Sequence, residues 1–229
     1  ICEISDKKTA HKVIKGLTKS EVKAILEMPD TNTKNGARDF CLLSLLYNTG
    51  ARVQELCDLK IGDISTGKLK QVLLTGKGQR QRMIPLWDET YTSLENYLVF
   101  RPDGRADEYL FLNAHGQPIT RAGISYIVKK HSKKAAKKCS SLEGRTITPH
   151  KYRHTTALHL IQSGVDITVV KEWLGHRSIN TTMVYVHINT EEKRKALEKC
   201  PAPTASLRKH RTKWREQGVL EFLHELCKH

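Results

Sequence analysis

A dense apolar run within residues 37–49 is the feature that most constrains how this chain can fold. The segment FCLLSLLY at 40–47 is interrupted by a single serine. A helix that is apolar all round lies inside a protein core. Gly50 follows the run, where a glycine commonly ends a helix. The sequence therefore predicts a buried helix over 37–49 that stops at Gly50.

Helix start and stop signals divide much of the remaining chain. Thr18 and Glu21 fit a capping box, and Leu17 with Val22 fits a hydrophobic staple, so a helix should begin here. Thr120 is a further candidate N-cap. The other predicted helices are at 53–59, 88–100, 120–138, 148–163, 166–174, 178–188 and 190–199.

The chain changes character between residues 69 and 86. Apolar residues at 72–74 and 83–86 flank the glycine-containing sequence TGKGQ. This pattern predicts two strands joined by a turn, with Lys77 at its tip. We expect another short strand at 109–112.

Charge favours a polyanionic partner. Lys plus Arg number 39 against 24 Asp plus Glu, which gives a net charge of +15 and a pI of about 9.6. Nucleic acid is the first candidate partner, and an anionic membrane surface is the competing one. No apolar run approaches the roughly 18 residues that span a bilayer, and no segment resembles a signal peptide. We therefore expect a soluble intracellular protein without a membrane partner.

The cysteine pattern argues against a disulfide framework and against a thiolate zinc site, because no C-x-x-C pair occurs. The six cysteines are Cys2, Cys41, Cys57, Cys139, Cys200 and Cys227.

The two ends of the chain differ in composition from the middle. The sequence starts at Ile1 without a methionine, so we expect a piece of a longer protein, with residues 1–16 as a basic lead-in. Pro201 and Pro203 interrupt the chain near its other end. Residues 201–229 then form a tail whose last part, 219–226, is amphipathic.

The segment TPHKYRH at 148–154 concentrates positive charge at a predicted helix start. Thr148 can cap the helix and Pro149 suits its first turn. His150 and Arg153 would then share one face near free N–H groups that favour an anion such as phosphate. His150 and His154 have the i,i+4 spacing of metal ligands, but no H-E-x-x-H motif accompanies them. We predict no metal site.

The second half of the predicted helix 120–138 is rich in lysine. These lysines recur at four-residue spacing and form a broad band suited to a phosphate backbone. A solvated helix surface without a partner is the alternative interpretation. The band consists of Lys129, Lys130, Lys133, Lys134, Lys137 and Lys138.

Four stretches occur in an order, spacing and context that resemble the catalytic domain of the tyrosine recombinases, the family of phage-type integrases and chromosome-dimer resolvases. They are TGARVQEL at 49–56, TGKGQRQRMIPL at 75–86, TPHKYRHTTALHLIQSG at 148–164 and LGHRSINTTMVYVHI at 174–188. The resemblance covers about 17–200. It implies a mainly α-helical fold with a small antiparallel β-sheet, an α+β class. Tyr152 departs from the leucine that is common in the family, but a large apolar side chain should still pack there.

The resemblance also implies a set of catalytic residues. Arg52 and Arg153 match the arginines that hold the scissile phosphate, and Lys77 matches the lysine that protonates the leaving 5′ oxygen. His150 and His176 match the two histidines, one for proton transfer and one as a hydrogen-bond donor. Tyr185 matches the nucleophile that forms a 3′-phosphotyrosyl bond. Glu55 should orient Arg52, and His154 and His187 are expected to support the site.

An enzyme with these residues would act on double-stranded DNA without ATP, a metal or another cofactor. The resemblance implies a homo-oligomer on DNA, a tetrameric synapse with the 201–229 tail contacting a neighbour, in a prokaryotic cytoplasm at the nucleoid. Its role would be integration, excision, transposition or dimer resolution. Two alternatives stay open: a type IB topoisomerase, and a DNA-binding regulator that retains the fold without the reaction.

Overall fold

The computed structural model describes residues 16–65 and 69–175. All of them lie in the first of the two units, 1–192 and 193–229, into which the chain divides. The helices predicted at 178–188 and 190–199, nearly all of the 1–16 lead-in and the 201–229 tail lie outside the described residues. Within the described ranges, no helix has both the length and the apolar character that crossing a membrane requires.

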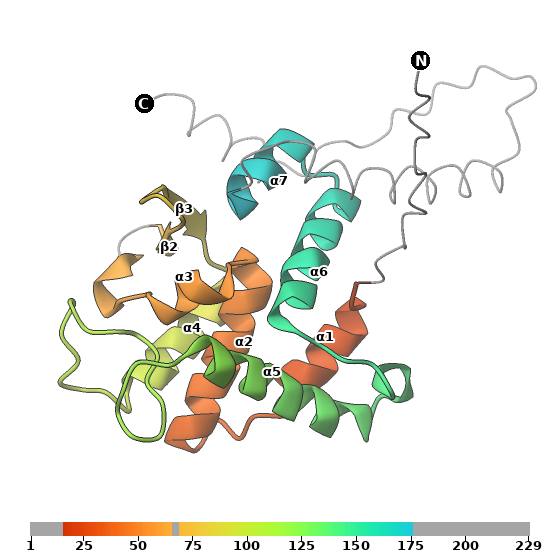
Figure 1. Cartoon of the computed structure of the whole chain (residues 1–229), viewed down its shortest axis with the longest axis horizontal. Helices are drawn as coiled ribbons and strands as arrows, with labels where there is room; N and C mark the ends of the chain where they lie inside the picture. The colour runs from red at the N-terminus through yellow and green to blue at the C-terminus, as the bar shows by residue number, and fades with distance from the viewer. Residues whose placement is uncertain (1–15, 66–68, 176–229) are drawn as a thin grey trace, which may run out of the picture. The chain divides into compact units, whose positions relative to one another are not determined.

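The described residues form a mainly helical structure with one small sheet, which confirms the expected fold class (Figure 1). The α-helices are α1 (Lys19–Leu26), α2 (Lys34–Thr49), α3 (Val53–Cys57), α4 (Asp88–Leu98), α5 (Arg121–Ala136), α6 (Pro149–Gln162) and α7 (Ile167–Leu174). Two 3₁₀ turns, η1 (Ile61–Asp63) and η2 (Ser140–Leu142), lie between them.

The caps explain where most helices begin. Thr18 and Glu21 form the predicted capping box of α1, and Thr120 and Thr148 cap α5 and α6. The prediction that α2 begins at residue 37 was wrong by three residues. Thr33 accepts a hydrogen bond from the Gly36 N–H and starts the helix earlier. The last residues predicted for α3 and α5 also lie beyond the ends of these helices.

The sheet has the strand order β1 (Ile64–Ser65), β2 (Gln71–Thr75), β3 (Gln81–Pro85), and both pairs are antiparallel. The β2–β3 hairpin is the one predicted. Strand β1 was missed because its two residues are too few to show the alternation of apolar and polar side chains that indicates a strand. The strand predicted at 109–112 was wrong. Its ends make only isolated bridges, Lys60 with Tyr109 and Leu112 with Pro118, so no ladder forms.

The predicted buried helix, α2, lies in the core. Cys41, Leu42, Leu43, Leu45 and Leu46 are all fully buried on it. It packs against α1, α4 and α6, which surround it in Figure 1. A separate apolar cluster joins α6 to α7. The core therefore holds α3, the hairpin and α7 in fixed positions around one end of α2.

Polar contacts tie α1 to residues far along the chain. The buried Leu17 N–H donates to Thr155 Oγ1 at 2.9 Å, across 138 positions of sequence. Arg145 pairs with the buried Glu21 and donates to the Gly16 carbonyl. The start of the described region is thus fastened to α6 and to the loop before it.

A buried carboxylate, Asp39, fastens α2 to α5. It accepts hydrogen bonds from Arg38 at 2.7 Å, from His131 at 2.8 Å and from Lys130 at 3.1 Å. Burial alone would raise the pKa of Asp39, but the bonds from His131, Arg38 and Lys130 outweigh it and lower this pKa. We call these four residues the Asp39 cluster.

Candidate active site

Arg52 lies directly after the turn that ends α2. Gly50 takes a positive φ of 58° there, and a Cβ on it would come within 2.7 Å of Leu174, so only glycine fits. Arg52 then stands at the N-cap of α3. Its side chain is 42% exposed and donates to Glu55 at 3.0 Å and to the Gly175 carbonyl at 2.9 Å. The guanidinium is thus held on one side and open on the other.

Glu55 is a buried carboxylate with four hydrogen bonds. It accepts from the Arg52 backbone N–H and side chain, as expected of a partner that orients Arg52. It also accepts two bonds from Arg82, at 2.9 and 2.7 Å. Burial would raise the pKa of Glu55, but the bonds and charge of Arg82, together with the Arg52 contacts, lower it. Glu55 is therefore ionised at neutral pH.

Arg82 was not predicted. It lies on β3 opposite Leu74, on the same face of the sheet as the buried Ile84, and its side chain is only 13% exposed. Besides its two bonds to Glu55, it donates through Nε to the Trp173 carbonyl at 2.8 Å. The signal that could have revealed it is an arginine at an inward-facing position of a strand, where a buried charge needs a partner.

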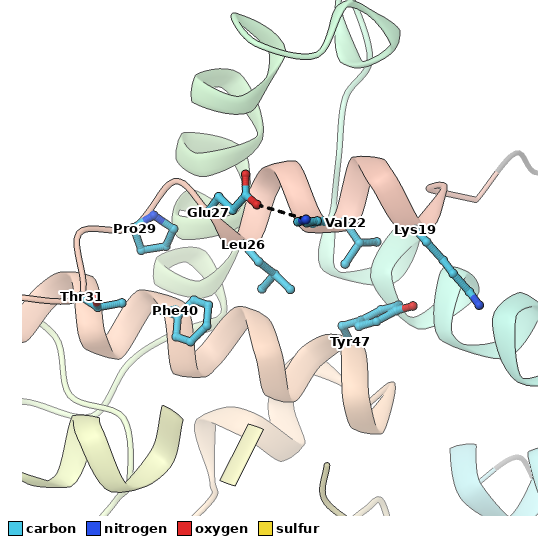
Figure 2. A pocket seen from close by; sticks show the side chains of 9 residues that line it. Lys19, Val22, Leu26, Glu27, Pro29, Thr31, Phe40 and Tyr47 are labelled. Atoms are coloured by element: carbon cyan, nitrogen blue, oxygen red, sulfur yellow. Dashed lines mark ion pairs between the residues drawn. The ribbon is translucent and has the colours of Figure 1, made fainter. Parts of the chain in front are cut away.

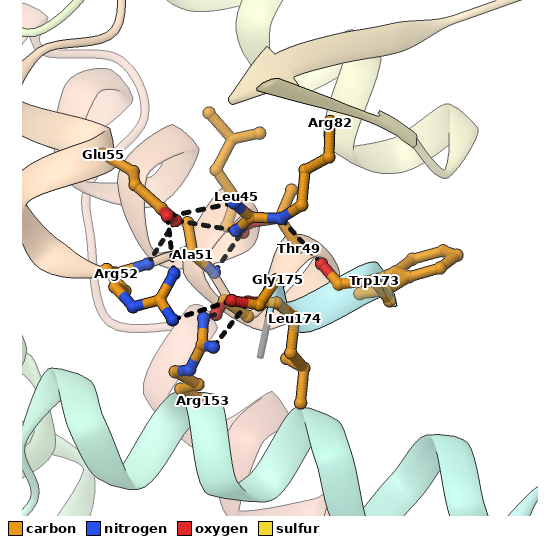
Figure 3. Close-up of polar contacts among 11 residues, drawn as sticks. Leu45, Thr49, Ala51, Arg52, Glu55, Arg82, Arg153, Trp173, Leu174 and Gly175 are labelled. Atoms are coloured by element: carbon orange, nitrogen blue, oxygen red, sulfur yellow. Dashed lines mark hydrogen bonds and ion pairs between the residues drawn. The ribbon is translucent and has the colours of Figure 1, made fainter. Parts of the chain in front are cut away.

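Arg153 is buried on α6, although the sequence predicted that it shares a face with His150 where an anion could bind. It donates to the Gly50 carbonyl at 2.7 Å and to the Leu174 carbonyl. Three consecutive carbonyls at the end of α7, Trp173, Leu174 and Gly175, therefore each accept a hydrogen bond from a different arginine. Figure 3 shows these arginines approaching Gly175 from three elements.

A cavity of about 520 Å³ opens beside Arg52 and the hairpin. Lys77 stands exposed at the hairpin tip, as predicted, and lines the same cavity. The charged groups around this space are mainly cationic, which suits a phosphate. The lining residues are Arg52, Gly76, Lys77, Arg80, Gln81, Arg82, Glu172 and Gly175.

A larger cavity of about 580 Å³ lies between α1 and α2 and has a different character (Figure 2). Val22, Leu26, Phe40 and Tyr47 give it an apolar wall. Among the predicted catalytic residues that the structure describes, none lines it, so the cationic cavity is the better candidate for an anionic substrate.

His150 and His154 lie one helical turn apart and are in direct contact. Their Nε2 atoms are 2.9 Å apart, and their rings meet edge to face with centroids separated by 4.2 Å. Partial burial and the charge of Arg153 lower the pKa of His150. Burial, His150 and Arg153 lower the pKa of His154 to about 4. Both imidazoles are thus neutral at pH 7, and one donates to the other.

His176, Tyr185 and His187 lie outside the described residues, so their geometry stays a prediction. Tyr152, the departure from the family pattern, is fully buried in the core as expected, and burial raises its pKa. Its hydroxyl has no hydrogen-bond partner among the described residues. None of the described tyrosines lines the cationic cavity.

The predicted lysine band is only partly free. Lys129, Lys133 and Lys134 are exposed on α5, and Lys137 and Lys138 are exposed just past its end. Lys130 differs, because its ammonium is paired with Asp39 in the interior. The helix turns Lys130 towards α2, so the exposed band has five members.

The described ranges contain no group of three or more histidine, cysteine or acidic side chains placed to hold a metal ion.

Residues 15–192 match the phage integrase family. The tyrosine recombinase XerD of Staphylococcus aureus is 40% identical over 183 residues, which cover 78% of this chain and 60% of XerD. The Sinorhizobium fredii protein y4rC, described as an integrase/recombinase, is 34% identical over 227 residues, covering 99% of this chain and 67% of that protein.

Solved structures have the same fold. The crystal structure of XerA recombinase matches with a TM-score of 0.67 and 29% identity, covering 81% of this chain and 64% of that one. XerH site-specific recombinase, in a post-cleavage complex with its palindromic difH substrate, matches with a TM-score of 0.71 and 27% identity. That match covers 84% of this chain and 55% of the XerH chain.

This chain thus spans 60% of XerD and 67% of y4rC. The family match, these relatives and the shared fold confirm the resemblance seen in the sequence motifs. This chain belongs to the phage integrase family of tyrosine recombinases.

Proposed function

We propose that this chain is the catalytic part of a site-specific DNA recombinase that cuts and rejoins strands through a 3′-phosphotyrosyl intermediate. The observation that carries the proposal is the convergence of Arg52 and Arg153 on the end of α7, with Lys77 beside Arg52 in the cationic cavity. His176 follows α7 directly, and Tyr185 comes nine residues later.

Arg52, which keeps an open side, would bind a nonbridging oxygen of the scissile phosphate. Arg153, which is buried and bonded to the Gly50 and Leu174 carbonyls, would bind one by exchanging a carbonyl bond for it. A guanidinium keeps its charge at all working pH values and presents paired N–H donors that match phosphate. Negative charge grows on these oxygens as the nucleophile attacks, so donors held in place beforehand lower the barrier. His176 would donate a further hydrogen bond to one of the same oxygens.

In the cleavage step, Tyr185 Oη attacks phosphorus and the Oη–P bond forms as the P–O5′ bond breaks. Lys77 gives a proton to the leaving O5′. The phenol proton passes to His150, whose neutral ring can accept it, and the burial and Arg153 charge that lower its pKa favour release of that proton afterwards. Rejoining runs in reverse, with a 5′ hydroxyl attacking the phosphotyrosine. The covalent bond retains the energy of the broken linkage, so neither ATP nor a metal is needed.

Double-stranded DNA is the proposed substrate. The net charge of +15 and the exposed lysines of α5 support it, as does the XerH recombinase structure, which holds a palindromic difH substrate after cleavage. Exchange between two duplexes cuts four strands, and each cut consumes one tyrosine. We therefore propose a tetramer on two DNA sites at the nucleoid, within the cytoplasm, with the 201–229 tail of each copy contacting a neighbour.

The first experiment identifies the nucleophile. DNA trapped covalently on the full-length protein in cells is sequenced, and the recovered site is built into a nicked substrate whose 5′ end diffuses away after cleavage. The wild type should accumulate an adduct on the 3′ end of the DNA, and Tyr185→Phe should form none while still binding DNA. Tyr109→Phe, which alters an exposed tyrosine outside the cavity, is the control and should react normally.

An adduct that persists in Tyr185→Phe would overturn the assignment. Relaxation of supercoils without exchange between two duplexes would instead favour a type IB topoisomerase. Binding without any adduct in the wild type would favour a DNA-binding regulator.

The second experiment tests Lys77 as the proton donor. Lys77→Ala should cleave slowly, and replacing the bridging 5′ oxygen by sulfur should restore most of its rate, because the thiolate leaves without a proton. Tyr185→Phe should stay inactive on both substrates. An equally slow Lys77→Ala reaction on the sulfur substrate would exclude this role.

A further inference from the structure

We infer that Arg82 is a positioning residue for Arg52. It neutralises Glu55 and holds its carboxylate in place, so that the charge and the open side of Arg52 remain available to the scissile phosphate. This inference rests on the proposed function, because it assigns Arg82 a part in the same phosphate-binding site.

The hydrogen-bond geometry separates the tasks of the two arginines. Arg82 uses Nε for the Trp173 carbonyl and both Nη atoms for Glu55, and its side chain is 13% exposed. Arg52 makes one side-chain bond to Glu55 and one to the Gly175 carbonyl, its Nε makes none with the described residues, and its side chain is 42% exposed. Although both line the cavity, Arg82 is engaged with the protein and Arg52 is open to a ligand.

Charge arithmetic gives the reason for a second arginine. Glu55 alone with Arg52 would be a neutral pair, and a buried carboxylate would attract the guanidinium away from a phosphate. With Arg82 present, the three groups carry a net charge of +1. The two Arg82 bonds also complete the hydrogen bonding of both Glu55 oxygens, and they contribute to the lowered pKa of this carboxyl.

Close packing fixes Arg82 in this arrangement. A Cβ on Gly175 would lie 3.1 Å from Arg82 Nη1, and a Cβ on Gly76 would lie 3.1 Å from Glu55 Oε1. Both glycines therefore permit the hairpin, α3 and the end of α7 to meet around the carboxylate. If Arg82 moved, the Glu55 carboxylate would lose two hydrogen bonds and could shift, and Arg52, which is bonded to Glu55, would shift with it.

The test is a double-mutant cycle on single-turnover cleavage of the nicked substrate at saturating DNA. Arg82→Gln should slow cleavage about 10- to 100-fold, the range for loss of an outer partner of a reactive group. In an Arg52→Ala background the same change should slow the residual reaction by no more than about twofold, because its effect runs through Arg52. DNA affinity should change much less than the rate.

Arg101→Gln is the matched control. The Arg101 side chain is only 6% exposed, donates to Glu108 and to the Tyr109 and Leu110 carbonyls, and lies outside the cavity. It should lower the thermal midpoint without slowing cleavage by folded protein. Arg82→Lys keeps the positive charge and loses the two parallel donors to Glu55, so it should cleave at an intermediate rate. If Arg82→Gln does not fold, Arg82→Lys takes its place in the double-mutant cycle.

The outcomes are separable. Equal costs of the Arg82 change with and without Arg52 would show a general structural role and overturn this inference, while wild-type adduct formation would leave the proposed function standing. A wild-type protein that forms no adduct would overturn both.

Discussion

Asp39 and Glu55 are both buried carboxylates that accept four hydrogen bonds, with more than one basic side chain among the donors. The difference lies in what those side chains can still reach. Around Asp39, the Arg38 side chain is 11% exposed, His131 is buried and Lys130 is 34% exposed, but none of the three lines the cationic cavity, and the cluster joins α2 to α5. Around Glu55, Arg82 is engaged with the protein, but Arg52 has an open side on the cavity. A buried ion cluster can serve a ligand when one of its cations has an open side.

Replacing the carboxylate of the Asp39 cluster should have the largest effect on stability. Asp39→Asn leaves Arg38, Lys130 and His131 without their shared anion in the interior. We expect a loss of about 3–5 kcal/mol in the free energy of unfolding, the usual cost of breaking a buried ion pair. Chemical denaturation measures it. Asp107→Asn, in an exposed pair with Arg105, is the control and should change stability far less than Asp39→Asn.

Removing the Arg52 side chain should slow the cleavage reaction, in contrast to the loss of stability expected for Asp39→Asn. Arg52→Ala should slow single-turnover cleavage by about 10²–10³-fold, as expected for loss of a donor to developing charge. Arg38→Ala in the Asp39 cluster should lower stability and leave the rate of folded protein unchanged. If Arg38→Ala slowed cleavage as strongly as Arg52→Ala, the distinction between the two clusters would fail.

The lysines of α5 sharpen the comparison, because Lys130 belongs to the Asp39 cluster and its neighbours do not. Replacing Lys133, Lys134 and Lys137 by Gln should weaken DNA binding and flatten the dependence of log K on log salt by up to about 2.7, or about 0.9 for each phosphate that is no longer neutralised. Lys130→Gln should leave that slope unchanged and lower stability. An unchanged slope in the triple variant would remove the band from the DNA interface.

We expect the two clusters to differ least in how acid affects the stability that they contribute. Both carboxyl groups have a lowered pKa, so their contribution to stability is present above their ordinary values of 3.8 and 4.5 and is lost at lower pH. His154 acts sooner. Its pKa falls from 6.5 to about 4 on folding, so the unfolded chain binds a proton that the native chain does not. Stability should therefore start to decline as pH falls below 6.5.

Thermal midpoints measured from pH 7.5 to 4 check this expectation. His154→Gln should flatten the upper part of the decline, and Asp39→Asn should leave that part unchanged. A decline in His154→Gln that matches the wild type would mean that other groups are responsible.

Local signals in the sequence predicted the described elements well. The capping box of Thr18 and Glu21, the Thr148 cap and the glycine stops at Gly50 and Gly175 act within one helical turn, so neighbouring residues decide them. The 109–112 segment failed because its apolar residues find only single bridging partners on other segments.

The site was predicted in part. Glu55 was predicted from its three-residue spacing to Arg52, and Lys77 from the turn that carries it, while the family resemblance pointed to Arg52 and Lys77. Arg82 was missed because nothing near it in sequence says that Glu55 and Trp173 will meet it. The burial of Arg153 was missed for the same reason, since the end of α7 covers it only after the fold closes.

The fastening of α1 has a consequence for synthesis on the ribosome. Leu17 and Glu21 find their partners in Thr155 and Arg145, and the Leu17 contact spans 138 positions. At roughly 5–20 residues per second, about 7–28 s pass between the emergence of the two ends. Until residues 121–136 have emerged, the apolar Val22 and Ile25 of α1 lack α5, the helix against which α1 packs.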